Sequence, residues 1–140
     1  KISPLYHTIF IFLCLHAFLI YVILNLAHSF SIKKIGNSFH LKNKKDKLKF
    51  LLYYLFGFII ISSFLFKIIG SLGLQIINFL FSFLLLFEIC MKISDSQRFL
   101  NWIGDNLEKP IRQLIMFVIS LNCTYFFTRI TQQIIESQNL

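Results

Sequence analysis

The chain of 140 residues has very few charged side chains for its size. Only 14% of its residues are charged, whereas soluble chains average about 25%. Hydrophobic residues make up 56% of the chain and aromatic residues 17%. Too few charged residues remain to cover the surface of a water-soluble domain, which excludes a soluble globular protein. Disordered chains are poor in apolar residues, so the high apolar content excludes a disordered protein as well. The composition therefore predicts an integral membrane protein.

Cysteine, glycine and proline are also scarce, and each shortage excludes a class of protein. The three Cys are scattered, which excludes a disulfide scaffold, a zinc ribbon and a Cys-x-x-Cys oxidoreductase. The five Gly form no nucleotide-binding loop, and no Walker A, His-Glu-x-x-His or Gly-x-Ser-x-Gly string occurs. No proline interrupts an apolar stretch. We predict no catalytic residues and expect no enzymatic activity of the chain itself.

Four apolar stretches are long enough, or nearly so, to cross a bilayer, which needs about 20 helical residues. Backbone groups in lipid must bond internally, and the apolar runs do not alternate as barrel strands would, so helices are predicted. We expect an all-α fold, with residues 1–140 forming a single membrane domain. The predicted transmembrane helices lie at about 5–29, 50–68, 72–92 and 110–135.

Two connections between these helices carry signals of their own. Gly70 and Gly73 favour a tight turn between the second and third helices, the alternative being one long helix over residues 50–87. Residues 94–109 open on Ser-Asp-Ser-Gln, which is similar to a capping box, and continue with apolar residues at helical spacing. We expect an amphipathic interfacial helix there, anchored by Trp102, the alternative being a helix packed on a soluble arm of another protein.

Basic residues outnumber acidic ones by 14 to 6, and their positions predict the topology. Residues 31–49 hold seven of them and residues 92–112 hold four, and with four spans both segments lie on one side. The positive-inside rule places that side in the cytoplasm or its organellar equivalent, and both chain ends opposite.

The loop over residues 31–49 is expected to set this topology and to contact anionic lipid headgroups. The residues predicted to contact headgroups are Lys33, Lys34, Lys42, Lys44, Lys45, Lys47, Lys49 and Trp102. Docking of an acidic partner is the alternative. Nucleic acid is not expected, because the loop has no Arg and only Phe39 and His40 for base stacking.

Polar side chains recur at helical spacing on three of the four predicted helices, the first, third and fourth. The first and third helices each have one polar face, and on the first the residues are spaced mainly seven apart. The fourth helix has two opposed polar faces, which predicts a partner subunit beside it. We interpret these faces as helix-packing or partner-facing surfaces, since small and polar residues join helices in membranes. The predicted residues are Cys14, Tyr21, Asn25, His28, Gln75, Asn78, Ser82, Asn122 and Arg129. A hydrophilic path is the alternative, disfavoured because no charge lies mid-span.

All four His residues lie in the first 40 residues, so a haem held by two His would need a second chain. His16, near the middle of the first helix and opposite its polar face, must find a polar partner or stay neutral. The string Pro-Leu-Tyr-His-Thr (residues 4–8) is similar to the haem-bearing anchor subunits of succinate dehydrogenase. It lacks the Arg-His pair of that family, so it identifies no family. His16 and His7 are the candidate cofactor ligands. Otherwise only bound phospholipid is expected.

Three functions compete at this point. The first is a non-catalytic structural subunit of a larger membrane complex, with other membrane subunits and anionic lipids as partners. The excess of Phe, Ile, Lys and Asn is typical of AT-rich genomes, including organelle genomes. We therefore expect a supernumerary subunit of a mitochondrial inner-membrane respiratory-chain or ATP-synthase complex, its basic loops in the matrix. The alternatives are a haem- or quinone-associated anchor of an oxidoreductase and a small homo-oligomeric transporter.

Overall fold

The structure, a computed structural model, describes residues 4–36, 39–103 and 106–138. Its elements are α1 (Pro4–Ser29), β1 (Lys34–Ile35), β2 (Phe39–His40), α2 (Lys44–Ile69), α3 (Ser71–Ser94), α4 (Gln97–Ile103) and α5 (Lys109–Gln138). The predicted helical fold with four long apolar helices is confirmed, since α1, α2, α3 and α5 are all long and apolar enough to cross a membrane. At about 1.5 Å per residue they span about 36–45 Å, more than the bilayer core of about 30 Å.

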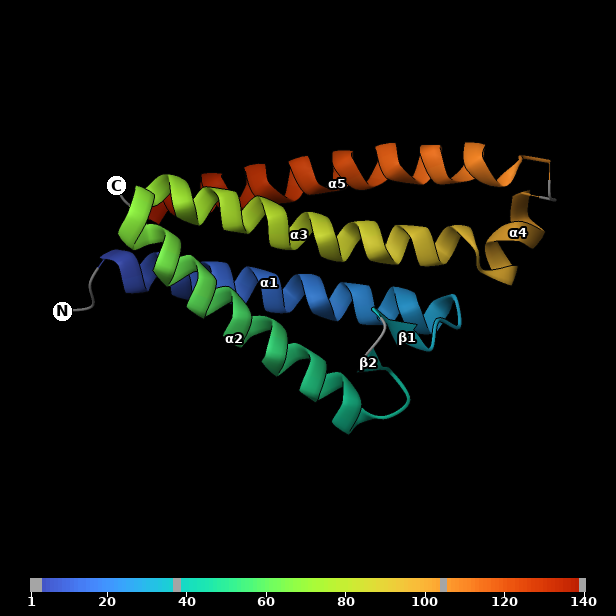
Figure 1. Cartoon of the computed structure of the whole chain (residues 1–140), viewed down its shortest axis with the longest axis horizontal. Helices are drawn as coiled ribbons and strands as arrows, with labels where there is room; N and C mark the ends of the chain where they lie inside the picture. The colour runs from blue at the N-terminus through green and yellow to red at the C-terminus, as the bar shows by residue number, and fades with distance from the viewer. Residues whose placement is uncertain (1–3, 37–38, 104–105, 139–140) are drawn as a thin grey trace.

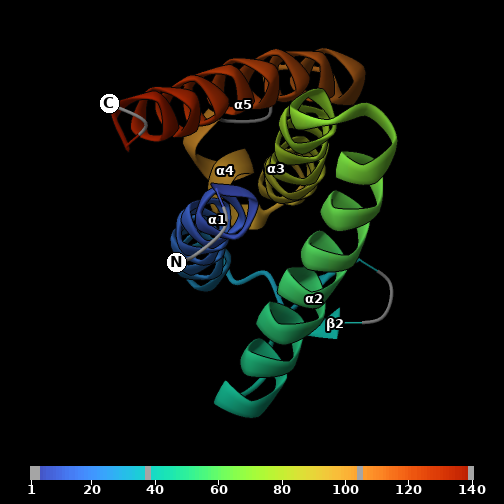
Figure 2. The same cartoon turned by 90° about the vertical axis from the view of Figure 1, so that its left-hand side faces the viewer.

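The four long helices run back and forth along one axis, and α3 lies at the centre (Figure 1). Both ends of the described chain lie at one end of the bundle, whereas the β1–β2 hairpin and α4 lie at the other. In the end-on view α1, α2 and α5 surround α3, and α2 leans away from the rest toward its first residues (Figure 2). The basic segments before α2 and before α5 therefore share the hairpin end.

A single residue separates α2 from α3, so the alternative of one long helix is wrong. Gly70 has a φ of 74°, a conformation that glycine adopts without steric cost. Its N–H donates to the Phe66 carbonyl at 2.9 Å. A Cβ at Gly73 would lie 2.8 Å from the Leu65 carbonyl, so glycine lets the two helices meet closely at their junction.

The expected loop over residues 31–49 is more ordered than its composition predicts. The helix α2 begins at Lys44, six residues early, because the Asn43 side chain caps it by accepting from the Asp46 N–H at 2.9 Å. Asp46 also lies in the first turn, where a carboxylate favours the helix dipole. The residues before it form the hairpin, which pairs Lys34 with His40.

The predicted amphipathic segment over residues 94–109 is shorter than expected. The helix α3 extends to Ser94, and α4 covers only Gln97–Ile103, while residues 104–105 lie outside the described part. The cap of α4 is Ser96, whose Oγ accepts from the Phe99 N–H at 3.3 Å, whereas Ser94 donates to its own helix. Trp102 is 81% exposed, so its anchoring in an interface stays a prediction.

Two apolar clusters form the core, one toward each end of the bundle. The hairpin-end cluster is built from Leu19, Ile20, Ile23, Ala27, Ile35, Leu41, Phe50, Leu85, Ile89, Cys90, Ile93 and Met116. The other cluster is built from Ile9, Phe12, Phe58, Leu74 and Ile77. On α1 the buried His16 lies between the residues of the two clusters, and on α3 the buried Asn78 does the same. Buried polar side chains are therefore found at the centre of the bundle.

Candidate functional site

His16 lies at the middle of the 26-residue helix α1, on its inner face, and is fully buried. Aromatic rings from two other helices surround its imidazole. The ring centroid of Phe58 lies 4.6 Å away, that of Phe127 5.2 Å and that of Tyr54 5.8 Å. A polar side chain in such surroundings must have hydrogen-bond partners, because an unpaired one costs about 1–3 kcal/mol.

A chain of hydrogen bonds through His16 joins all four long helices. His16 Nε2 lies 2.7 Å from Asn78 Oδ1, which can only accept, so Nε2 carries the proton. In the neutral ring Nδ1 then accepts from the Tyr54 hydroxyl at 2.8 Å. Beyond it, Asn78 Nδ2 donates to Thr131 Oγ1 at 2.7 Å, and Thr131 donates to the Thr128 carbonyl at 2.7 Å. The chain runs from α2 through α1 and α3 to α5.

This polar cluster of Tyr54, His16, Asn78 and Thr131 joins four helices through hydrogen bonds. Both ring nitrogens of His16 are bonded, so binding a cofactor would require it to give up Tyr54 or Asn78. The amide of Asn78, which stands in the middle of the chain, does not pass a proton as a carboxylate or imidazole would. Fully bonded buried networks instead favour one arrangement of the surrounding helices.

The other candidate ligand, His7, lies on the exposed side of α1. In the described ranges no group of three or more His, Cys, Asp or Glu side chains comes close enough to hold a metal ion. His7 and His16 thus point to opposite sides of their helix, and one ligand site within this chain does not contain both.

The inner polar faces of α3 and α5 are buried as the packing interpretation expects, but most of them bond differently. Ser82 donates to the carbonyl of Asn78, Ser120 to that of Phe117 and Thr124 to that of Ser120, each within its own helix. These hydroxyls are thereby satisfied, and the small side chains let α3 and α5 approach closely. Among the buried polar residues of α3 and α5 named here, only Asn78 and Thr131 of the polar cluster make side-chain hydrogen bonds to another helix.

Gln75, grouped with these residues in the sequence, lies exposed one turn before Asn78. It lines a surface pocket together with Asn78, Phe79, Thr128 and Gln132. The polar cluster therefore approaches the surface at the α3–α5 groove.

The polar face of α1 points away from the bundle. Cys14, Tyr21, Asn25 and His28 are all exposed, and no side-chain hydrogen bond joins them to another described residue. Within this chain α1 packs through its apolar positions and His16 rather than through that face. That the face meets a partner stays a prediction.

The outer face of α5 also carries polar side chains. Asn122 donates to the Val118 carbonyl at 3.1 Å, and Arg129 donates to the Tyr125 hydroxyl at 3.3 Å, both contacts within α5. After Arg129 the helix α5 continues for nine more residues. Arg129 lies two residues before Thr131, which belongs to the central polar cluster, so its charge is carried near the middle of the bundle.

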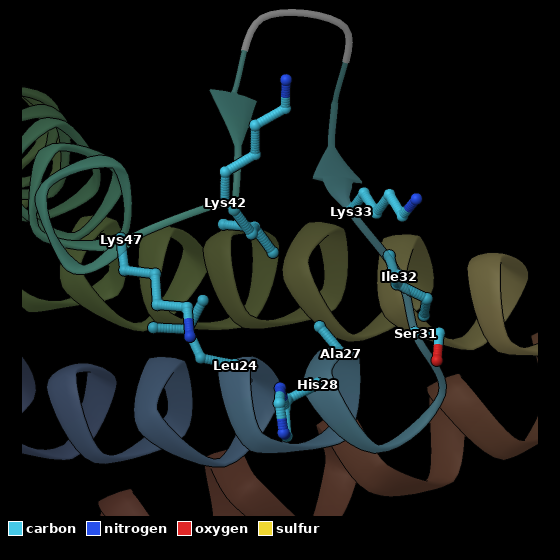
Figure 3. Close-up of a pocket in the computed structure, with 9 residues that line it drawn as sticks. Leu24, Ala27, His28, Ser31, Ile32, Lys33, Lys42 and Lys47 are labelled. Atoms are coloured by element: carbon cyan, nitrogen blue, oxygen red, sulfur yellow. The ribbon is translucent and has the colours of Figure 1, made fainter.

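The predicted headgroup lysines separate into groups at the hairpin end. Lys33, Lys42 and Lys47 line one pocket, which His28 also lines (Figure 3). Lys34 and Lys49 line neighbouring pockets. Lys44 and Lys45 are exposed on the first turn of α2 and line none of these three pockets.

Comparisons of the chain with known proteins found no matching model of a protein family, no matching curated protein and no matching solved structure. The geometry described above is therefore the basis for assigning a function.

Proposed function

We propose that this protein is a non-catalytic structural subunit of a hetero-oligomeric membrane complex. Its four long helices would cross the bilayer, with the hairpin and α4 on one side and both chain ends on the other. The lengths of the helices and the concentration of basic residues at the hairpin end support this arrangement.

The observation that carries the proposal is the contrast between the exposed faces of different helices. The middle of α2 exposes Phe56, Ile60 and Phe64, which suit lipid. The middle of α5 exposes Asn122 and Arg129, and an Arg at the centre of a lipid-facing helix costs roughly 2.5–3.5 kcal/mol on insertion scales. Contact with another protein that offers a carboxylate or backbone acceptors would offset that cost.

The outer face of α1 supports the same conclusion independently. Tyr21 and Asn25 are exposed on this face, and lipid offers no hydrogen-bond partner to polar side chains inside the bilayer core. A single chain leaves two polar faces uncovered, one on α1 and one on α5, so at least one neighbouring subunit is needed. The inner polar cluster, by contrast, is complete without one.

We further propose a location in the mitochondrial inner membrane, with the hairpin in the matrix. The excess of Phe, Ile, Lys and Asn supports an organelle or AT-rich source, and the basic end supports the orientation. A respiratory-chain or ATP-synthase assembly fits a small supernumerary subunit of this kind.

Native mass spectrometry of the tagged chain, extracted in mild detergent, tests the proposal. We expect a large complex containing other membrane proteins. A homodimer without other proteins would overturn the structural-subunit assignment.

Two substitutions on α5 locate the contact. Arg129→Leu and Asn122→Leu should weaken co-purification of the other subunits, whereas Ile60→Leu on the apolar face of α2 is the control and should leave it unchanged. Full assembly of both α5 variants would show that this face does not meet a partner.

A further inference from the structure

A pocket of about 490 Å³ lies at the hairpin end, between the last turns of α1, the base of the hairpin and the start of α2. Its apolar part consists of Leu24, Ala27, Ile32 and Leu41, of which Ala27 and Leu41 are buried. Its polar residues are His28, Ser31, Lys33, Lys42 and Lys47. The pocket thus combines an apolar floor with a cationic rim.

Backbone hydrogen bonds hold the walls of this pocket in place. The Ile32 N–H donates to the Ala27 carbonyl at 2.8 Å, which folds the chain back at the end of α1. The Leu41 N–H donates to the Lys33 carbonyl at 2.8 Å, which closes the base of the hairpin between two of the rim lysines. The shape is therefore formed before any ligand arrives, which lowers the entropic cost of binding.

No carboxylate lines the pocket, and this sets it apart from its neighbours. The adjacent pocket that shares Lys33 contains Asp95, and the one that shares Lys42 contains Asp46. No described carboxylate lies within ion-pair distance of Lys33, Lys42 or Lys47, since the ion pair found in the described ranges joins Lys92 to Glu88. Among the described residues, the three rim lysines therefore form no ion pair, although Asp46 and Asp95 line the neighbouring pockets.

The three lysine side chains point in different directions (Figure 3). The Lys42 ammonium lies along the hairpin and that of Lys33 to its side, so both would have to turn toward a ligand over Leu24 and Ala27. Lys47 reaches from α2 toward α1 beside Leu24, while Lys33 and Lys42 extend from the two sides of the hairpin base. A free anion would make no use of the apolar floor beneath them. A phospholipid would use both, with its phosphate at the rim and its glycerol and first acyl carbons over Leu24.

We propose that this pocket binds one anionic phospholipid through its phosphate headgroup. The assignment rests on the membrane insertion proposed above but not on the role as a subunit, because it concerns a site formed by this chain alone. The lipid would reside in the leaflet on the basic side, where the helix ends reach the headgroups. Basic pockets among helix ends on that side are suited to such headgroups.

The test uses the full chain in lipid nanodiscs of phosphatidylcholine with a minor fraction of phosphatidylglycerol. The protein is released from the nanodiscs, and the lipids that remain bound to it are counted by native mass spectrometry. The pocket variant is Lys42→Gln with Lys47→Gln, and the matched control is Lys44→Gln with Lys45→Gln, which removes the same charge from the same segment outside the pocket. Each rim lysine should contribute about fivefold to affinity, so the pocket variant should lose about 25-fold and the control far less.

The outcomes separate the possibilities. Equal losses in the two variants, or no loss in either, would overturn the proposal, because the charge would then act diffusely or not at all. Inorganic phosphate that displaces the lipid at equal concentration would also overturn it, because the apolar floor would contribute nothing. Lys33→Gln provides a second rim variant should the double variant not fold, and it must reproduce a loss of about fivefold. Co-purification of other subunits is scored separately, so failure of the lipid site is distinguishable from failure of the assembly role.

Discussion

Polar side chains on the two faces of α1 have opposite surroundings. The inner face buries one polar residue, His16, and supplies both of its ring nitrogens with partners from α2 and α3. The outer face exposes Cys14, Tyr21, Asn25 and His28, which have no side-chain partners within the described chain. The polar residue of the inner face is thus fully bonded within the chain, whereas those of the outer face are exposed and bond to no other described side chain.

This difference between the two faces of α1 allows effects on the stability of the single chain to be distinguished from effects on its proposed assembly with other proteins. A group that is bonded inside the bundle contributes to folding of the single chain, and its removal leaves buried partners unsatisfied. A polar group on the outer face makes no side-chain hydrogen bond within the described chain, so in the proposed assembly it would act on the contact with another protein. Substitutions on the two faces should therefore change different measurements.

The largest effect on stability is expected at Asn78, which bonds to both His16 and Thr131. Asn78→Leu removes both bonds and leaves the buried Nε2–H of His16 unpaired, which should lower the free energy of unfolding by about 3 kcal/mol. Reversible unfolding in mixed detergent micelles measures the change. Gln75→Leu, exposed on the same helix, is the control and should change stability by less than about 0.5 kcal/mol.

His16 should have the next largest effect. His16→Leu leaves the Asn78 side-chain Oδ1 and the Tyr54 hydroxyl without their partner, at a cost of about 2 kcal/mol by the same measurement. The matched substitution on the outer face is His28→Leu, which should leave the stability of the isolated chain unchanged. Equal changes in the two histidine variants would contradict the distinction between the faces.

Removal of one hydroxyl at the start of the chain of hydrogen bonds should have a smaller effect. Tyr54→Phe keeps the ring packed against His16 and Phe81 but removes the donor to Nδ1, at a cost of about 1 kcal/mol. Tyr53→Phe is the neighbouring control, since Tyr53 is exposed. A stability loss at Tyr53 as large as at Tyr54 would mean that the hydroxyl bond to His16 is not what is measured.

The smallest effect on stability is expected on the outer face of α1. Asn25→Leu should change the free energy of unfolding by less than about 0.5 kcal/mol, because its side chain makes no described contact that folding needs. The same variant should nevertheless recover less of the partner subunits on affinity purification. Unchanged recovery together with lowered stability would reverse the roles assigned to the two faces.

Much of the fold could be predicted from the sequence, because lipid-length apolar runs and their glycine junction depend only on local composition. The early start of α2 was missed because the lysine-rich stretch was interpreted as a loop, although Asn43 with Asp46 three residues later is an N-cap signal in the sequence. The hairpin also makes a distant contact, in which the Gly36 N–H donates to Glu88 Oε1 at 2.8 Å. That contact is not visible in a local pattern.

The candidate site was predictable in part. His16 and Asn78 are identifiable as mid-helix polar residues, but Tyr54 was missed because α2 has no polar periodicity. A signal was present, since Tyr54 stands four residues from both Phe50 and Phe58 on the inner face of α2. The direction of the polar face of α1 could not be predicted, because polar residues mark either the inside of a bundle or a surface that another chain covers.

The most direct test of the central claim compares two equally exposed positions in the native membrane. A photo-crosslinking amino acid replaces Tyr21, 64% exposed on the polar face of α1, or Ile60, 66% exposed on the apolar face of α2. The account predicts that position 21 cross-links to another protein and that position 60 cross-links to lipid. Cross-linking of position 21 to lipid alone would contradict it.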